Sequence, residues 1–250
     1  MASGAIDADG ATDRLDWSSI SNRASLPWTF SCWINLGTAS GAQYVFCAHD
    51  PGDSSVAFII GTTTTDRVST TYVHSGTNQQ RISSDNAFPT GIHHLVVTHD
   101  GTLNSSGVVV YVDGVDVSAG GTTGTGTPSA STGTWSLFGR TLDDARNLDA
   151  SMQTVGVWDR VLGAGEIAAL ALKASPLFFP KGLLWEPELW GTAASLAELD
   201  PITGTAATAD GCAAVERFSP TWYPGSSEEW HAAAGAAAVS VALLRRRGRA

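Results

Sequence analysis

The 250-residue sequence is poor in cysteine, methionine and positive charge, and it has no long hydrophobic run. Its three cysteines (Cys32, Cys47 and Cys212) lie far apart, which excludes a disulfide-rich scaffold and predicts free, buried thiols in a reducing compartment. Fourteen Lys and Arg stand against 24 Asp and Glu, so nucleic acid is not an expected partner. The most apolar stretch, AAAGAAAVSVALL near the C-terminus, is mostly alanine and too short to span a membrane.

Catalytic and targeting motifs are missing as well. The opening MASGAIDADG has no basic and apolar leader, so the sequence predicts no secretion signal. No Gly-x-Ser-x-Gly elbow, phosphate-binding loop or dinucleotide fingerprint is present. A glucanase needs paired carboxylates on one strand, and the one such pair, Glu186 and Glu188, has Pro187 between its members. The sequence therefore predicts a protein that is not an enzyme.

The sequence is instead a succession of short predicted strands. Apolar and polar residues alternate over 28–36, which predicts a half-buried strand with Trp28, Phe30, Cys32, Ile34 and Leu36 on its core face. Asp113-Gly114 lies between β-branched runs and predicts a type I′ hairpin, in which both turn residues have positive φ. About ten to thirteen strands at this spacing predict an all-β sandwich. Further strands are predicted at 44–48, 56–60, 67–73, 80–83, 92–100, 134–140, 151–160, 182–191 and 214–224, with a loop at 118–134.

Two segments are predicted to be helical. Residues 161–174 place Leu162, Ile167, Leu170 and Ala171 on one side. Residues 226–250 are predicted to be a separate Ala- and Arg-rich helical arm, with four Arg and two Glu against 10 basic and 22 acidic residues in 1–225. This charge difference predicts an arm that packs on protein. Its predicted contact residues are Trp230, Val241, Leu244, Arg245, Arg246 and Arg247.

Four motifs then occur in a familiar order: IDADGATDRLDW, WTFSCWINL, HHLVVTHDGT with VVVYVDGVDV, and SLFGR with MQTVGVWDRVLGAGEIAAL. Through them, over about residues 4–172, the chain resembles the laminin G-like branch of the concanavalin A-like lectin/glucanase superfamily. The resemblance implies a jelly-roll sandwich of two antiparallel sheets in residues 1–225, with a short helix near 161–174. The family's functions include glycan binding, adhesion, polysaccharide hydrolysis and structural roles in phage particles, so the fold alone does not decide between them.

The resemblance also implies that calcium is the cofactor to consider, although the chain is not expected to require one. Calcium takes six to eight oxygen ligands, so loops rich in aspartate are the candidates. Gln153 stands where relatives often carry an acidic residue, and aspartates in turns commonly cap local N–H groups instead. The candidate calcium ligands are Asp50, Asp53, Asp143, Asp144 and Asp149.

A glycan site would need an aromatic ring for stacking and polar side chains for the sugar hydroxyls. Most of the nine tryptophans are expected in the core, because large rings stabilise sandwich packing. The predicted glycan-binding residues are Tyr72, His74 and Arg81 on the strands of 67–83.

Three functions from different classes remain open at this point. The first is a structural or adhesion module of a phage virion that decorates the capsid or tail, is assembled in the host cytoplasm, and has copies of itself or capsid and tail proteins as partners. The absence of an export signal and the predicted arm favour it. The second is a glycan-binding, lectin-like domain, and the third is a polysaccharide hydrolase.

Overall fold

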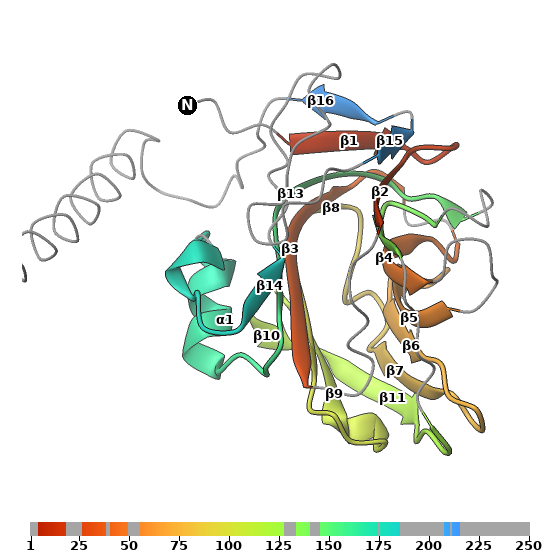
Figure 1. The fold of residues 1–250 in the computed structure, drawn as a ribbon. Coiled ribbons are helices and arrows are strands. Elements are labelled where there is room, and N and C mark those ends of the chain that lie inside the picture. The colour runs from red at the N-terminus through yellow and green to blue at the C-terminus, as the bar shows by residue number, and fades with distance from the viewer. Residues whose placement is uncertain are drawn as a thin grey trace, which may run out of the picture. The chain divides into compact units, whose positions relative to one another are not determined.

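The computed structural model describes residues 5–18, 27–38, 41–49, 56–127, 134–140, 146–174, 176–185, 208–210 and 212–215 (Figure 1). The helical segments are η1 (Ser105–Gly107), α1 (Ala164–Ala171) and η3 (Pro176–Phe178). The strands are β1 (Ala5–Asp9), β2 (Arg14–Ser18), β3 (Trp28–Leu36), β4 (Tyr44–His49), β5 (Val56–Thr62), β6 (Val68–Tyr72), β7 (Gln79–Ser83), β8 (Gly91–His99), β9 (Val108–Val112), β10 (Val115–Asp116), β11 (Ser118–Thr122), β12 (Thr134–Leu137), β13 (Asp149–Trp158), β14 (Leu183–Trp185), β15 (Thr208–Asp210) and β16 (Ala213–Val215).

These strands form two antiparallel sheets. Sheet A has the order β10-β9-β8-β3-β13-β1-β16, with β14 beside β13, and sheet B has the order β11-β7-β6-β5-β4-β12-β2-β15. Strands that follow one another in sequence are often not neighbours, as where β3 lies between β8 and β13. The predicted all-β sandwich of jelly-roll type is confirmed. The predicted arm at 226–250 lies outside the described residues.

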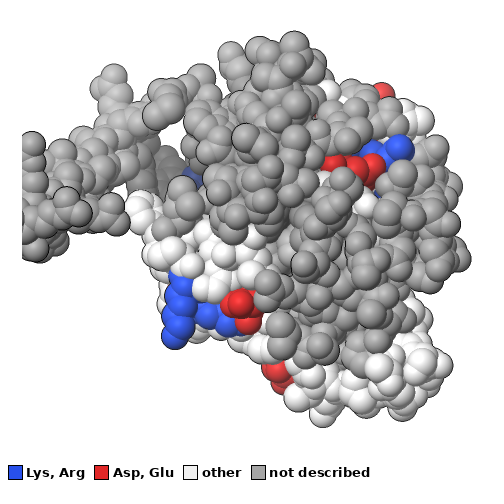
Figure 2. Space-filling model, viewed as in Figure 1, with Lys and Arg blue, Asp and Glu red and all other residues white. Residues whose placement is uncertain are grey.

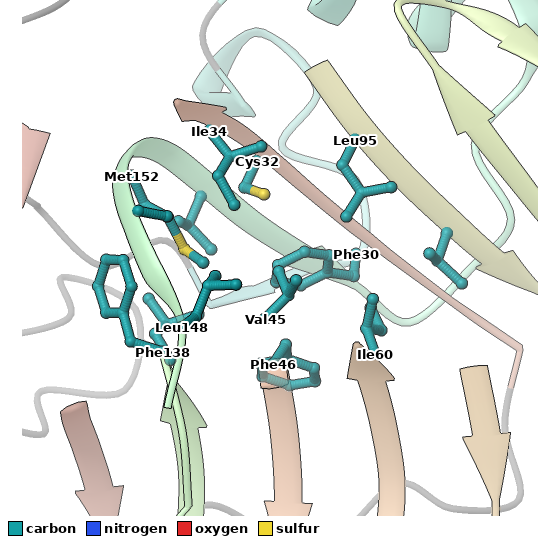
Figure 3. Packing of buried hydrophobic residues seen from close by; sticks show 14 of the residues in the cluster. Phe30, Cys32, Ile34, Val45, Phe46, Ile60, Leu95, Phe138, Leu148 and Met152 are labelled. Carbon is teal, nitrogen blue, oxygen red and sulfur yellow. The ribbon is translucent and has the colours of Figure 1, made fainter. Parts of the chain in front are cut away.

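The core lies between the two sheets. Phe30 of β3 stacks on Phe46 of β4 with ring centroids 4.9 Å apart, which joins sheet A to sheet B. Figure 3 shows these rings together with Cys32, Ile34, Leu95 and Met152, whose side chains fill the space around them. All five residues predicted for the core face of β3 are buried in this cluster. Each apolar side chain removed from water here stabilises the fold by about 1.5–3 kcal/mol.

Both faces of β3 are buried, however, where the alternation predicted a half-buried strand. The helix α1 covers the outer face of sheet A, and Val96, Trp158, Leu162, Ile167 and Leu170 form a second apolar cluster there. Figure 1 shows α1 on the side of β3 and β13 that is turned away from β4–β7. Three of these residues belong to the stripe predicted for 161–174, so the helix and its buried side are confirmed.

Two turns of this region follow from backbone conformation. Asp113 and Gly114 have φ of 52° and 80°, so both residues of the β9–β10 turn are left-handed, as the predicted hairpin requires. The helix α1 ends before Lys173, which has φ of 65°, the conformation that commonly terminates helices. No helix among the described residues is long and apolar enough to cross a membrane.

The sequence missed two short strands, β11 and β15. Residues 118–134 were predicted to be a loop, but β11 lies within them and pairs with β7. Its Ser-Ala-Gly-Gly-Thr sequence has no apolar alternation, because it joins the sheet through backbone hydrogen bonds rather than through a core-facing side. The strand β15 has only three residues, too few for a period to be visible, whereas β10 completes the predicted hairpin and β16 overlaps the strand predicted at 214–224.

The three cysteines are free and buried, as predicted. Burial raises the pKa of the Cys47 thiol to about 12, and it raises the pKa of Cys32 even further. Both thiols are therefore neutral packing groups at physiological pH and not nucleophiles.

Candidate functional site

The outer face of sheet B carries a row of side chains that runs across seven strands. Strand register places Asp16 opposite Ser136, Ser136 opposite Cys47, and Cys47 opposite Ile59. It continues from Ile59 through Thr71 and Gln80 to Thr122. Their chain neighbours Leu15, Phe46, Ile60 and Leu137 lie in the core, so this row points away from it. We call these seven residues, all of them polar except Cys47 and Ile59, the polar row.

One end of the polar row lies on β2, β12 and β4, and we call it the closed end. Its side chains are linked in a chain of hydrogen bonds. The Ser136 hydroxyl donates to Asp16 Oδ1 at 2.5 Å, and Arg14 Nε donates to Asp16 Oδ2 at 3.0 Å. Because the serine proton is committed to the aspartate, Ser136 Oγ accepts from His49 Nε2 at 2.9 Å. His49 and Ser136 are fully buried, so this end has a structural role.

A second polar group on sheet B surrounds Tyr44 of β4. Arg146 Nη1 donates to the Tyr44 hydroxyl at 2.8 Å, and the guanidinium carbons of Arg140 and Arg146 lie 5.6 and 5.5 Å from the ring centroid. The ring is buried and in contact with two cations, which is favourable because the ring face is electron-rich.

On the face drawn in Figure 2, the described residues present few charged groups. Most of the acidic groups there lie beside basic groups.

The opposite end of the polar row is more open. Ile59, Thr71 and Gln80 are half-buried, and Thr122 is exposed on β11. The polar row therefore changes from a buried ionic chain on β2, β12 and β4 to accessible hydroxyl and amide groups on β6, β7 and β11.

The described residues include two buried serine–histidine pairs, and neither has the arrangement of a catalytic triad. In a triad the histidine lies between serine and carboxylate, whereas Ser136 lies between His49 and Asp16. The second pair joins Ser31 Oγ to His94 Nε2 at 2.9 Å on the α1 side of sheet A. Asp113 accepts from the backbone N–H of His94 and not from its ring, and the ring Nδ1 has no hydrogen-bond partner.

The predicted glycan residues Tyr72, His74 and Arg81 lie on the face of sheet B that is turned toward sheet A. Tyr72 and His74 are 3% and 5% exposed, and the Tyr72 hydroxyl accepts from Trp28 Nε1 at 3.1 Å. Arg81 pairs in register with the buried Thr70, so it shares the face that is turned toward sheet A. Alternation along 67–83 could not show which face is inside, because the inner face here is itself polar.

Internal hydrogen bonds explain how polar residues are buried between the sheets. His99 Nδ1 accepts from the Gly101 N–H at 2.8 Å, so its Nε2 carries the proton and donates to Gln79 Oε1 at 2.9 Å. The Gln79 amide then donates to the carbonyls of Thr102 and Asn104 at 3.0 and 2.7 Å. Burial lowers the pKa of His99 to about 4, so this network contains neutral imidazole.

His74 lies beside this network but outside it. Neither ring nitrogen has a hydrogen-bond partner, and the Nε2 atom lies 3.0 Å from where a Cβ would stand at Gly124. Burial lowers the pKa of His74 below its usual value, and the neighbouring Gln79 side chain opposes this shift. It fills space against Tyr72, with ring centroids 5.9 Å apart.

Of the candidate calcium ligands, the structure describes Asp149 alone; Asp50, Asp53, Asp143 and Asp144 lie outside the described residues. Asp149 is the first residue of β13, pairs with Asp9 of β1, and packs its carboxylate over Gly37. Within the described ranges, no three His, Cys, Asp or Glu side chains are grouped as metal ligands. The calcium loops stay a prediction.

Arg14, Asp16, Tyr44, His49 and Ser136 were not found from the sequence. Arg14, Asp16 and Ser136 alternate with Leu15, Trp17, Trp135 and Leu137, so a non-core face could have been recognised on β2 and β12. The β4 sequence YVFCAH has no such alternation. Which strands lie beside one another depends on sheet order, and no local pattern contains that information.

The family follows from the sequence itself. The model of the concanavalin A-like lectin/glucanases superfamily (Laminin_G_3) matches residues 9–168, well over half of the chain. The chain belongs to this superfamily. No curated protein matches the sequence.

Solved structures agree with the family fold. A Bacteroides ovatus protein named as a candidate carbohydrate-binding protein matches with a TM-score of 0.60 at 14% identity over 88% of this chain. The chain spans 61% of that protein's length. A heptameric pentraxin of Limulus polyphemus matches with a TM-score of 0.50 at 14% identity, over 86% of this chain and 95% of its own. At these identities the matches show the shared fold.

Proposed function

We propose that this chain is a non-catalytic carbohydrate-binding domain that takes glycan on the open end of the polar row. The observation that carries the proposal is the register-aligned series Ile59, Thr71, Gln80 and Thr122 on the outer face of sheet B. The superfamily contains lectins, and one of the similar structures is named for carbohydrate binding, which supports the same ligand class.

The chemistry of this end of the row suits a sugar. Thr71 and Thr122 offer hydroxyl groups and Gln80 an amide, which can donate to and accept from sugar hydroxyls. Ile59 adds an apolar surface in the same row, which fits the C–H face of a pyranose ring. These side chains lie on a sheet rather than on loops, so their spacing is fixed before any ligand binds.

A glycan array with the purified chain, followed by affinity measurement on the best glycan, tests the proposal. Thr71→Arg places a long charged side chain across the row and should weaken binding at least roughly tenfold. Val109→Arg is the matched control, because Val109 is also a half-buried strand residue but lies on sheet A. Equal affinity of both variants, or no glycan bound by the parent, would contradict the proposal.

Separate measurements distinguish the other functions predicted from the sequence from glycan binding. Reducing-sugar release from the bound glycan would indicate a hydrolase, for which the described serine–histidine pairs provide no triad. Calcium dependence would appear as loss of binding in chelator. The phage-virion role, its partners and its assembly in a host cytoplasm stay predictions that the described residues do not address; removal of 226–250 tests whether the arm is needed for assembly.

A further inference from the structure

Strand β11 ends sheet B with an open backbone edge. It pairs with β7 on one side, and no described strand lies on its other side. Residues Ala119 to Thr122 are all exposed, so the edge is accessible to another molecule. The edge strands β10, β14, β15 and β16 have only two or three residues, whereas β11 has five.

This edge carries no charge and no proline, although its pairing with β7 has a register shift between Ser118 and Gly120. Proteins commonly protect an open edge with charged residues, proline or very short strands. Residues 117–127 (VSAGGTTGTGT) contain neither a charge nor a proline, although the whole chain carries a net charge of −10. The charge-free edge is therefore a place where two copies can approach with little repulsion.

An exposed apolar residue lies next to the same edge. Val115 of β10 is 63% exposed. Because only Val117 separates β10 from β11, the edges of the two sheets lie on the same side of the sandwich. Val115 can therefore bury apolar surface against any partner that pairs with β11.

We propose that two copies of this chain associate by antiparallel pairing of their β11 strands, which joins the two B sheets. A second copy fits better than a foreign peptide, because a strand paired antiparallel with itself forms a closed twofold contact that uses one surface twice. With the twofold axis near Gly120, the two Asp116 carboxylates are eight strand positions apart. That separation is roughly 26 Å at about 3.3 Å per residue, more than a Debye length in physiological salt.

The pairing has a consequence for the outer face of sheet B. The axis of such a pair runs perpendicular to the sheet, so both copies of the polar row point to the same side. A dimer could then bind one multivalent glycan through two faces. This consequence rests on the proposed function, whereas the dimer does not.

The interface is small, so the dimer should be weak and reversible. Five residue pairs and one apolar side chain per copy correspond to a transient contact, with a dissociation constant of roughly 10 µM to 1 mM. Sedimentation equilibrium of the full chain should show a monomer–dimer equilibrium in that range. A parent that stays monomeric throughout it would overturn the proposal.

Gly120→Lys is the decisive variant. A Cβ at Gly120 has no atom within 4 Å and its φ is not in the left-handed region, so lysine fits the monomer and puts a charge on the edge. Gly165→Lys on α1 is the matched control, since its Cβ also meets open space. We expect dimerisation to weaken at least roughly tenfold in Gly120→Lys and to be unchanged in Gly165→Lys.

A measurement on the parent removes any dependence on the variant's folding. Amide hydrogen exchange at Gly120 and Thr122 should slow as the concentration rises through the dissociation constant, because the edge N–H groups become paired. Dimerisation with unchanged exchange in β11, or equal dimerisation of Gly120→Lys, would assign the contact to another surface. Neither outcome depends on whether the chain binds glycan.

Discussion

The outer faces of the two sheets have opposite character, although both are built by alternating strands. The outer face of sheet A carries Val96 and Trp158 and is covered by α1, which adds Ile167 and Leu170, and by Leu162 just before the helix. The outer face of sheet B carries Asp16, Ser136, Thr71 and Gln80, and within the described ranges no helix covers it. The same architecture therefore covers the outer face of one sheet with a helix and leaves part of the other outer face accessible.

The difference begins in the strand sequences. Where outward positions are apolar, their exposure is costly, and covering them stabilises the fold. The eight-residue helix α1 does this with Ile167 and Leu170, together with Leu162 just before it. Where outward positions are polar, hydrogen bonds within the sheet satisfy the buried groups and the remaining ones stay accessible. Substitutions on sheet A should therefore change mainly stability, and substitutions at the open end of sheet B mainly binding.

The largest effect is expected from Trp158→Ala beneath α1. The Trp158 ring is fully buried, its Nε1 donates to the Phe179 carbonyl at 2.8 Å, and it packs over Gly156. Its loss leaves a cavity and an unpaired carbonyl, so the free energy of unfolding should fall by about 3–5 kcal/mol. Urea denaturation of parent and variant measures it; a loss below about 1 kcal/mol would show that the helix covers the sheet without stabilising it.

Mild acid should produce the second-largest effect, through the buried histidines. Burial lowers the pKa of His94 to about 3 and that of His99 to about 4, from 6.5 in the unfolded chain. The unfolded state binds more protons below pH 6.5, so stability is complete above that pH and falls as the pH decreases toward 4. Between about pH 7 and about pH 5 each histidine should remove about 2 kcal/mol.

The ion-paired carboxylate of Glu166 acts in a lower pH range than the histidines. The hydrogen bonds from Arg160 lower the pKa of Glu166, so its contribution is lost at pH values lower than those at which the histidines act. A His99→Gln variant should show a shallower decrease of unfolding free energy with falling pH than the parent. Identical slopes would mean that His99 is charged in the folded protein.

A third effect, of intermediate size, concerns the hairpin beside α1. Gly114 has φ of 80°, and a Cβ there would lie 3.2 Å from the Cβ of Ala171. Gly114→Val therefore adds backbone strain and crowds the helix, with an expected cost of about 1–3 kcal/mol. Gly165→Ala, where the Cβ meets open space, is the control and should not lower the melting temperature. Equal melting temperatures for parent and Gly114→Val would contradict the left-handed turn.

The contrast between the faces also explains what could be predicted from sequence. The core face of β3, the Asp113-Gly114 turn and the buried side of α1 were predicted because each depends on a local period or a local backbone requirement. The placement of Tyr72 and His74 was not, because the Tyr72 hydroxyl is satisfied by Trp28 of another sheet and the His74 ring packs on Tyr72. A polar residue reads as exposed until the partner that satisfies it is known, and that partner is set by the sheet order.

The smallest expected effect on stability, and the sharpest test of the comparison, lies within the polar row itself. Thr71 is half-buried at the open end, so Thr71→Ala should change the free energy of unfolding by no more than about 0.5 kcal/mol. Ser136→Ala at the closed end removes the hydroxyl between His49 and Asp16, leaves both without that partner, and should cost about 1–3 kcal/mol. In the glycan assay we expect the opposite order. Thr71→Ala should weaken glycan binding, because it removes a proposed ligand contact, and Ser136→Ala should leave the affinity unchanged. If both variants lose stability but keep glycan affinity, the whole row is structural and the binding face must lie elsewhere on the sandwich.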